Sequence, residues 1–218
     1  MKLGVVMDPI GSINIKKDSS LDIMIEAQNR GHKLSYIEPT SLYINEQGAH
    51  ALMHEIEVFD NADKWFELDD LSANKLSDLD VIMMRQDPPF DSDYIYNTYV
   101  LESAEKEGVN VINRPRSLRD CNEKVFATEF PECCTPFLVA SDQALLRDFV
   151  RTHKDTVIKP LDGMGGSSIF RLREGDPNIA VVLETITSFY KSKVMIQRYI
   201  PEIEEGDKRI LMINGKPM

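Results

Sequence analysis

The chain has 218 residues, of which 42% are hydrophobic and 28% charged, and it carries a net charge of −11 at pH 7. A chain this acidic, with an isoelectric point near 4.9, is not expected to bind the phosphate backbone of nucleic acid. No apolar run approaches the about 20 residues that cross a bilayer, and the first residues, MKLGVVMDPIG, reach a charge and a proline too soon for a signal peptide. We therefore expect a soluble, cytoplasmic protein with no membrane partner, large enough for two domains.

Residues 1–112 alternate between strand and helix patterns, which is typical of a parallel sheet. Buried strands are predicted over residues 2–8, 32–38, 79–85 and 109–112, and helices over residues 21–30 and 93–108. Asp18, Ser19 or Ser20 can cap the first helix, and Asp91 or Ser92 the second. Residues 41–59 are interpreted as an edge hairpin or meander. In such sheets ligands bind at the carboxyl ends of the strands, so the loops there are the first candidates for a site.

A different pattern follows residue 123. Helices are predicted over residues 141–153 and 178–190, and strands over residues 155–160, 167–173 and 193–200. Together they predict a small two-layer α+β unit. Residues 201–218 end in a hairpin with the turn Asn214-Gly215. We expect domains over 1–123, 124–200 and 201–218, the last one begun rather than finished.

The cysteines and histidines do not form a recognisable site. Cys121, Cys133 and Cys134 fit neither a disulfide framework nor a CxxC metal site, and we interpret them as reduced thiols. The four histidines are His32, His50, His54 and His153. Only His50 and His54 have i, i+4 spacing, and no third ligand has a suitable spacing, so surface histidines are favoured over a metal site.

The stretch VIKPLDGMGGSSIF, residues 157–170, places three glycines between two strands. Glycines there often do no more than allow a turn, and the spacing matches neither the P-loop nor the dinucleotide fingerprint. Two lysines favour a phosphate site: Lys159 closes an apolar strand, and Lys124 lies in an apparent helix begun by Asp120 or Asn122. The strand edge at residues 195–201 could offer backbone groups to a purine ring.

The motifs MDPI, NIKKDSS, RQDPPFD, RDCNEK and KPLDGMGG occur in this order, followed by QRYIPEIEEGDKRI. In this order they resemble the ATP-grasp superfamily, and specifically the bacterial type of glutathione synthetase, over essentially the whole chain. The resemblance implies an α/β fold: an N-terminal parallel-sheet (pre-ATP-grasp) domain, a small α+β ATP-grasp lid subdomain and a truncated last ATP-grasp subdomain. It also implies ligation of γ-L-glutamyl-L-cysteine to glycine through an acyl phosphate, with release of ADP and phosphate.

The resemblance assigns roles toward ATP. Lys124 and Lys159 match the two family lysines that contact the phosphates, with Lys159 also catalytic. The mobile lid that closes over the phosphates matches Gly163, Met164, Gly165, Gly166, Ser167 and Ser168. The segment expected to hold adenine, chiefly by backbone hydrogen bonds, matches Gln197, Arg198, Tyr199 and Ile200. Asp207 matches a position near the ribose, and Arg209 matches a catalytic position that could steady the acyl phosphate.

For γ-glutamylcysteine the candidates lie in the first domain: Asn14, Asp18, Ser19 and Arg85. An arginine at a strand end can bind a carboxylate through two hydrogen bonds. Two alternatives stay open: Asp18 and Ser19 could act only as helix caps, and Arg85 could pair with Asp87 or Asp91.

The Mg²⁺ ligands of the family are expected beyond residue 218. On the same resemblance the chain by itself is predicted to be inactive, with weakened nucleotide binding, and the full-length enzyme is predicted to be a homo-oligomer. Two further readings remain: a different ATP-grasp ligase acting on other carboxylates, or a short form that binds nucleotide without catalysis.

Overall fold

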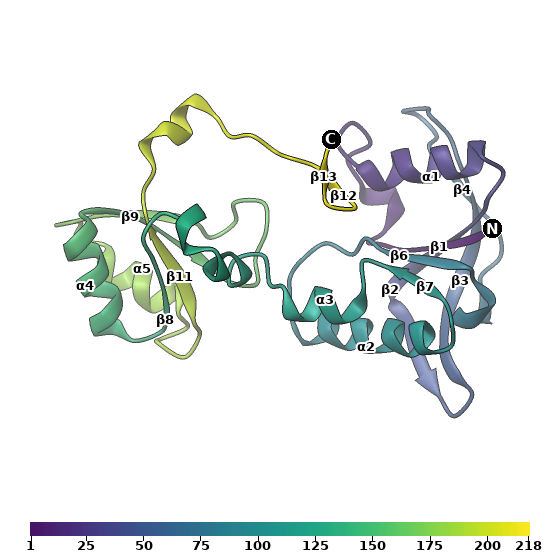
Figure 1. Ribbon diagram of the computed structural model, residues 1–218, viewed down its shortest axis with the longest axis horizontal. Coiled ribbons are helices and arrows are strands. Elements are labelled where there is room, and N and C mark those ends of the chain that lie inside the picture. The colour runs from purple at the N-terminus through teal and green to yellow at the C-terminus, as the bar shows by residue number, and fades with distance from the viewer. The chain divides into compact units, whose positions relative to one another are not determined.

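The structure is a computed structural model that describes all of residues 1–218 (Figure 1). The chain divides into two compact units. The first comprises Met1–Glu123 with Asp162–Gly165, and the second comprises Lys124–Leu161 with Gly166–Met218. Each unit has its own sheet and its own hydrophobic core. None of the helices has both the length and the apolar character needed to cross a membrane.

The first unit is built on a seven-stranded mixed sheet in the order β4-β3-β2-β1-β6-β7, with β5 paired to β3. Strands β2, β1, β6 and β7 are parallel to one another, whereas β3 pairs antiparallel with β2, β4 and β5. The strands are β1 (Lys2–Val6), β2 (Lys33–Asn45), β3 (Gly48–Val58), β4 (Phe66–Leu68), β5 (Ser72–Lys75), β6 (Val81–Met84) and β7 (Asn110–Ile112). The helices are η1 (Ile10–Ser12), α1 (Ser19–Asn29), η2 (Leu76–Asp78), α2 (Ser92–Lys106) and α3 (Pro115–Asp120). The parallel α/β architecture predicted from the sequence is confirmed.

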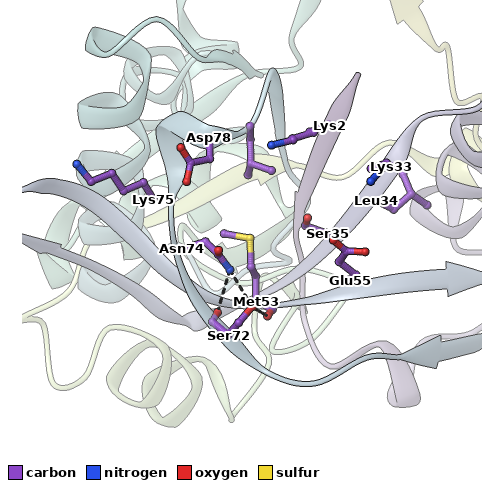
Figure 2. Close-up of a pocket in the computed structure, with 11 residues that line it drawn as sticks. Lys2, Lys33, Leu34, Ser35, Met53, Glu55, Ser72, Asn74, Lys75 and Asp78 are labelled. Atoms are coloured by element: carbon purple, nitrogen blue, oxygen red, sulfur yellow. Dashed lines mark hydrogen bonds between the residues drawn. The ribbon is translucent and has the colours of Figure 1, made fainter.

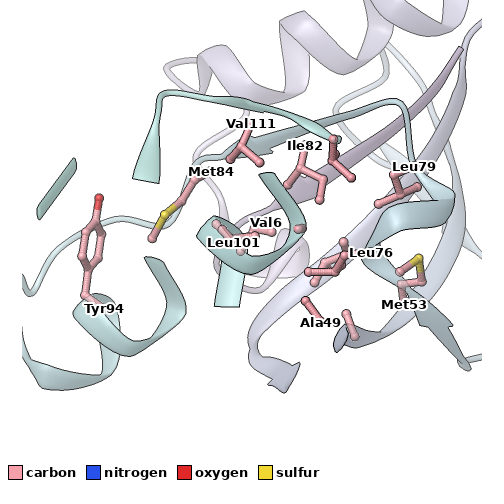
Figure 3. Close-up of a cluster of buried hydrophobic side chains, with 14 residues drawn as sticks. Val6, Ala49, Met53, Leu76, Leu79, Ile82, Met84, Tyr94, Leu101 and Val111 are labelled. Carbon is pink, nitrogen blue, oxygen red and sulfur yellow. The ribbon is translucent and has the colours of Figure 1, made fainter. Parts of the chain in front are cut away.

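The central strands are apolar throughout because both faces of the sheet are covered. Leu3 and Val5 pack in a cluster with α1, while Val6 packs in a second cluster with α2. Figure 1 shows α1 and α2 on opposite sides of the sheet, and Figure 3 shows Leu101 of α2 beside Val6. Gly4 leaves room for this second cluster: a Cβ there would lie 2.6 Å from Leu79 Cδ1, so the Leu79 side chain would have to shift.

The caps that the sequence predicted set the starts of both long helices of this unit. The Asp18 carboxylate accepts hydrogen bonds from the backbone N–H groups of Ser20 and Leu21, and the Asp91 carboxylate accepts from Tyr94 N–H. These caps satisfy N–H groups that have no partner inside the helix. Both helices therefore begin directly after the loops that follow β1 and β6.

The second unit is a two-layer structure on a four-stranded antiparallel sheet in the order β10-β9-β11-β8. The strands are β8 (Phe137–Ala140), β9 (Asp155–Pro160), β10 (Phe170–Arg173) and β11 (Val194–Arg198). The helices are η3 (Phe126–Glu129), η4 (Pro131–Cys133), α4 (Gln143–His153), α5 (Ile179–Ile186) and η5 (Pro201–Glu205). One core contains Leu146 of α4, Leu183 of α5, Ile158 of β9 and Ile196 of β11. The α+β unit is as predicted, with β8 as an additional strand that the sequence analysis missed.

The chain ends in a two-stranded hairpin of β12 (Met212–Ile213) and β13 (Lys216–Pro217). Asn214 and Gly215 have φ values of 50° and 75°. Positive φ at both central residues is the geometry for which Asn-Gly is favoured, and the predicted turn is confirmed.

Two local predictions were wrong. Lys124 does not lie in a helix, because α3 ends at Asp120 and residues 122–125 form an irregular turn before η3. Helix α5 ends at Ile186, four residues earlier than predicted. There Thr187 Oγ1 donates to Leu183 O (2.5 Å) and accepts from Tyr190 N–H (2.8 Å), and residues 188–190 all adopt positive φ.

Candidate functional site

A polar cluster lies where β1 and β6, two neighbouring parallel strands, reach their carboxyl ends. Asp8 follows β1, Arg85 follows β6, and the Arg85 N–H donates to Val6 O (2.6 Å), which extends the pairing of the two strands. The loop after β1 leads into the capped start of α1. The fold thus brings the start of α1 to the same edge of the sheet as Arg85.

The Arg85 side chain joins these elements. Its Nε donates to Ser20 Oγ (3.0 Å) and its Nη2 donates to Ser19 Oγ (2.9 Å), across 65 and 66 residues of chain. The two hydrogen bonds fix the guanidinium at the start of α1 through neutral hydroxyls. Of the alternative partners, Asp91 instead caps α2 with its side chain. Asp87 stays within reach of the Arg85 charge, which lowers the pKa of its carboxyl, but the guanidinium's hydrogen bonds go to the two serines.

Asp87 brings a third carboxyl group to this edge. Its N–H donates to Asp8 Oδ2 (2.8 Å), so the loop after β6 is tied to the loop after β1. Burial, followed by the charges of Asp8 and Asp18, raises the pKa of the Asp87 carboxyl, and Arg85 opposes the rise. Carboxyl groups and a fixed guanidinium therefore share this edge of the sheet, an arrangement that can receive both an ammonium and a carboxylate group.

Asp87→Asn should stabilise the first unit at pH 7 and leave its stability unchanged below about pH 3.8, the ordinary value for this carboxyl. The folded-state pKa is raised, so the native protein favours the protonated acid, and stability is lost as pH rises through the folded pKa. The neutral amide avoids that loss. Urea unfolding at pH 7 and pH 3.5 measures the effect. Asp63→Asn, in the exposed connection between β3 and β4, is the matched control, and an equal gain at both pH values would contradict the explanation.

The loop between β1 and α1 is ordered by Asn14. Its Oδ1 accepts from Lys16 N–H (3.2 Å), and its carbonyl accepts from the N–H groups of Lys17 (2.8 Å) and Asp18 (3.0 Å). Asn14 therefore shapes the turn that delivers Asp18, Ser19 and the start of α1. The structure brings Asn14, Asp18, Ser19 and Arg85 to one edge of the sheet, and it adds Asp8, Ser20 and Asp87, which the sequence analysis did not select.

The first unit also has a cavity of about 270 Å³, which lies at the opposite edge of the sheet (Figure 2). Lys2 and Lys33, at the amino ends of β1 and β2, line it together with Lys75, Glu55 and Asp78. Ligands of parallel sheets bind at the carboxyl ends of the strands. None of the predicted site residues lines this cavity, and we do not assign the substrate site to it.

In the second unit, Lys159 lies on the face of the sheet that is opposite α4 and α5. Side chains alternate along β9: Thr156 and Ile158 are buried on the helix side, and Lys159, half-buried, points to the other side. Lys159 pairs with Met195, and Gln197 pairs with Val157, two positions along. Lys159 and Gln197 therefore share one face on neighbouring strands.

The glycine stretch connects β9 to β10 as an exposed turn. Gly165, Gly166 and Ser168 have φ values of 68°, 78° and 57°, and a Cβ built on either glycine would meet nothing within 4 Å. The glycines are thus required by backbone conformation and not by close packing. The stretch is a turn between antiparallel strands, as the simpler reading held, and its role toward phosphate stays a prediction.

The segment Gln197–Ile200 leaves the sheet at the end of β11. Arg198 N–H donates to Pro136 O (2.9 Å), and Tyr199 N–H donates to Asp155 O (3.0 Å). Arg171 holds the same corner: its guanidinium makes two hydrogen bonds to the Asp155 carboxylate (2.8 and 2.6 Å) and stacks 3.4 Å from the centre of the Tyr199 ring. These hydrogen bonds lower the pKa of the Asp155 carboxyl. Sequence reasoning missed Arg171 and Asp155 because only the register of β9 against β10 places them together.

The remaining predicted residues lie outside regular structure. Lys124 occupies the turn before η3, and Asp207 and Arg209 lie in an exposed segment between η5 and β12.

Of the two histidines of β3, His50 differs from the expectation of a surface residue, whereas His54 is partly exposed. His50 is buried, its Nδ1 lies 3.0 Å from Gly48 O, and its ring stacks on Tyr43 at 5.3 Å. His54 Nδ1 lies 2.6 Å from Asp69 O. Because both occupy a strand, their i, i+4 spacing does not have the meaning that it has on a helix.

Comparison with known proteins gives consistent matches along the chain. Residues 1–119 match the N-terminal domain of prokaryotic glutathione synthetase, and residues 123–218 match the ATP-grasp domain of the same family. The glutathione synthetase of Pseudomonas aeruginosa is 55% identical over all 218 residues, which cover 69% of that protein. The glutathione synthetase of Salmonella typhi is 50% identical over the same residues and is covered to the same 69%.

Among solved structures, a D-cycloserine synthetase is similar with a TM-score of 0.61 at 14% identity, over 93% of this chain and 61% of the other. D-alanyl-alanine synthetase A from Vibrio cholerae is similar with a TM-score of 0.58 at 12% identity, over 100% of this chain and 65% of the other. These two likenesses concern the fold alone. The sequence matches to glutathione synthetases are far closer and extend over both units. The chain therefore belongs to the prokaryotic glutathione synthetase family.

Proposed function

We propose that this chain supplies the γ-glutamylcysteine site and most of the ATP site of an ATP-dependent ligase that joins γ-L-glutamyl-L-cysteine to glycine. The family match carries the reaction class. The observation that carries the substrate assignment is Arg85, whose guanidinium is fixed by two serine hydroxyls and makes no hydrogen bond to a carboxylate.

In this proposal Arg85 binds a carboxylate of γ-glutamylcysteine, and Asn14, Asp18 and Ser19 line the same site. A guanidinium suits a carboxylate because its N–H groups match the two oxygens. The peptide is also a primary amine, and Asp8, Asp18 and Asp87 offer carboxylates to its ammonium group. Two requirements of one zwitterionic peptide are thus met at one edge of the sheet.

For ATP, Lys124 and Lys159 supply positive charge to the phosphates, and the N–H groups of residues 163–168 close over them. Bound ATP would supply the phosphoryl group that activates the cysteine carboxylate for attack by the glycine amine. Lys159 would stabilise the charge that moves with this group. Asp207 would lie near the ribose, and Arg209 would steady the acyl phosphate.

We propose that the Arg198 carbonyl and the Ile200 N–H form the hydrogen bonds to adenine. In extended chain, groups two residues apart point to the same side, and Ile200 is extended with φ of −108° and ψ of 105°. Arg198 O receives only a long hydrogen bond from Thr135 Oγ1 (3.4 Å), while the intervening Tyr199 N–H is used by Asp155. Adenine carries an amino donor and ring-nitrogen acceptors that complement a carbonyl and an N–H.

The proposal assigns no Mg²⁺ ligands within this chain. Residues 1–218 contain no group of three or more His, Cys, Asp or Glu side chains that could hold a metal. We therefore place no step of the reaction on a metal bound by these residues.

We further propose that the 218 residues alone bind nucleotide weakly and form no glutathione. Every residue from 201 to 218 is exposed, including Asp207 and Arg209, which supports weak binding of nucleotide by this part of the chain. We also propose domains over residues 1–123, 124–200 and 201–218, and a cytoplasmic location. We further propose that the full-length enzyme is a homo-oligomer, and light scattering would measure its mass in solution.

The test combines thermal unfolding, calorimetry and an ADP-release assay on the purified chain. ATP should raise the melting temperature, γ-glutamylcysteine should bind at a separate site, and no glutathione should form when glycine is added. Binding of D-alanine or another amino acid in place of γ-glutamylcysteine would favour a different ATP-grasp ligase. Glutathione formation by the chain would refute the proposed inactivity while supporting the reaction.

A further inference from the structure

The only tryptophan of the chain contacts the loop that leads to the candidate substrate site. Trp65 lies just before β4, and its Nε1 donates to the carbonyl of Ile10 in η1 (2.9 Å). Its ring meets Phe66 edge-on at 5.6 Å. The side chain therefore carries one specific hydrogen bond to a loop that is 55 residues away in the sequence.

The N–H of the same residue, Ile10, is held by a second side chain. It donates to Tyr36 Oη (3.2 Å), and that hydroxyl lies 3.1 Å from Glu38 Oε1. Burial, opposed in part by the hydrogen bond to Ile10, raises the pKa of Tyr36 to about 12. The hydroxyl thus stays protonated at neutral pH, so it donates to Glu38 while accepting from Ile10 N–H.

Both backbone polar groups of Ile10 are thus bound by side chains from other elements, Tyr36 of β2 and Trp65. The Ile10 side chain, 2% exposed, is anchored in the cluster that contains Tyr36 and is packed by Trp65 and Phe66. One residue of a short 3₁₀ turn is fixed at its N–H, its carbonyl and its side chain.

Ile10 lies in the same loop as the residues of the candidate substrate site. Asp8, two residues before it, accepts the hydrogen bond from Asp87 N–H. Asn14 and Asp18, after it, form the turn and cap that present Ser19 to Arg85. A loop has little stability of its own, so the fixed point in its middle determines where its polar residues lie.

We propose that Trp65 and Tyr36 are positioning residues for γ-glutamylcysteine: they fix the peptide groups of Ile10 and thereby place Asn14, Asp18 and Ser19 opposite Arg85. This inference rests on the proposed function. Because Trp65 donates to the same loop, its fluorescence also reports occupancy of the substrate site.

The test compares Trp65→Phe and Tyr36→Phe, each of which keeps an aromatic ring and removes one hydrogen bond to Ile10. Tyr36→Phe also removes the hydrogen bond to Glu38. Each should weaken γ-glutamylcysteine binding by about fivefold, the usual effect of one neutral hydrogen bond. Both variants should leave the Kd for ATP unchanged, which a general loss of structure would not. Tyr43→Phe, in the same strand as Tyr36 but stacked on His50 of the hairpin, is the matched control and should leave both affinities unchanged.

A measurement on the unaltered chain does not depend on the folding of any variant. Titration with γ-glutamylcysteine should change Trp65 emission saturably, with the Kd that calorimetry gives. Calorimetric binding with unchanged emission would overturn the reporter role of Trp65, and unchanged affinity in both phenylalanine variants would overturn the positioning role alone. Absence of calorimetric binding to the unaltered chain would overturn the proposed substrate and, with it, this inference.

Discussion

Replacing Lys159 with methionine should weaken ATP binding by about 10- to 150-fold, the effect of losing a charged hydrogen bond worth about 1.5–3 kcal/mol. Methionine keeps the length and apolar stem of the side chain and removes only the ammonium group. Lys159 lies half-buried on the face opposite α4 and α5, so the variant leaves the core of the unit intact. Calorimetric titration with ATP measures the change.

Lys154→Met is the control for this variant. Lys154 follows α4, is exposed, and pairs with Glu174 (2.7 Å) on the surface. Its removal changes the net charge equally without touching the candidate site. A Kd for ATP within twofold of the unaltered chain for Lys159→Met would remove Lys159 from the nucleotide site.

Arg85→Ala should weaken γ-glutamylcysteine binding by a similar factor, about 10- to 150-fold. Arg85→Lys keeps the positive charge but replaces the planar guanidinium with a compact ammonium group. The ammonium cannot contact a carboxylate and both serine hydroxyls in the same way, so we expect an intermediate loss of affinity. Binding of ATP should not change in either variant. Calorimetry with each ligand separates the two effects.

The control here is Arg30→Ala, which removes an exposed arginine paired with Glu26 on α1. It should leave both affinities unchanged. Equal losses for γ-glutamylcysteine and ATP in Arg85→Ala would show that the arginine supports the fold and does not bind the peptide. An unchanged affinity for the peptide would move the substrate site elsewhere.

The sequence by itself determined the features that depend on neighbouring residues. Apolar runs and helical spacing located most strands and the longer helices, Asp18 and Asp91 identified the caps of α1 and α2, and Asn214-Gly215 identified the last turn. These signals are local because caps and turns are closed by groups within a few residues. The motifs, taken in their order along the chain, were also enough to identify the family, because a match of all of them in order is far more specific than a match of any one.

Only the tertiary structure decided which side chains meet. Ser19 and Ser20 look like helix-capping residues in the sequence, yet their hydroxyls bind a guanidinium that is 66 and 65 residues away, respectively, because β1 and β6 are adjacent and parallel. The pairing of Arg171 with Asp155 depends on the register of β9 against β10, and the clamp on Ile10 depends on two elements converging on one turn. Such contacts are set by strand order and side-chain direction, which a pattern of residue types does not specify.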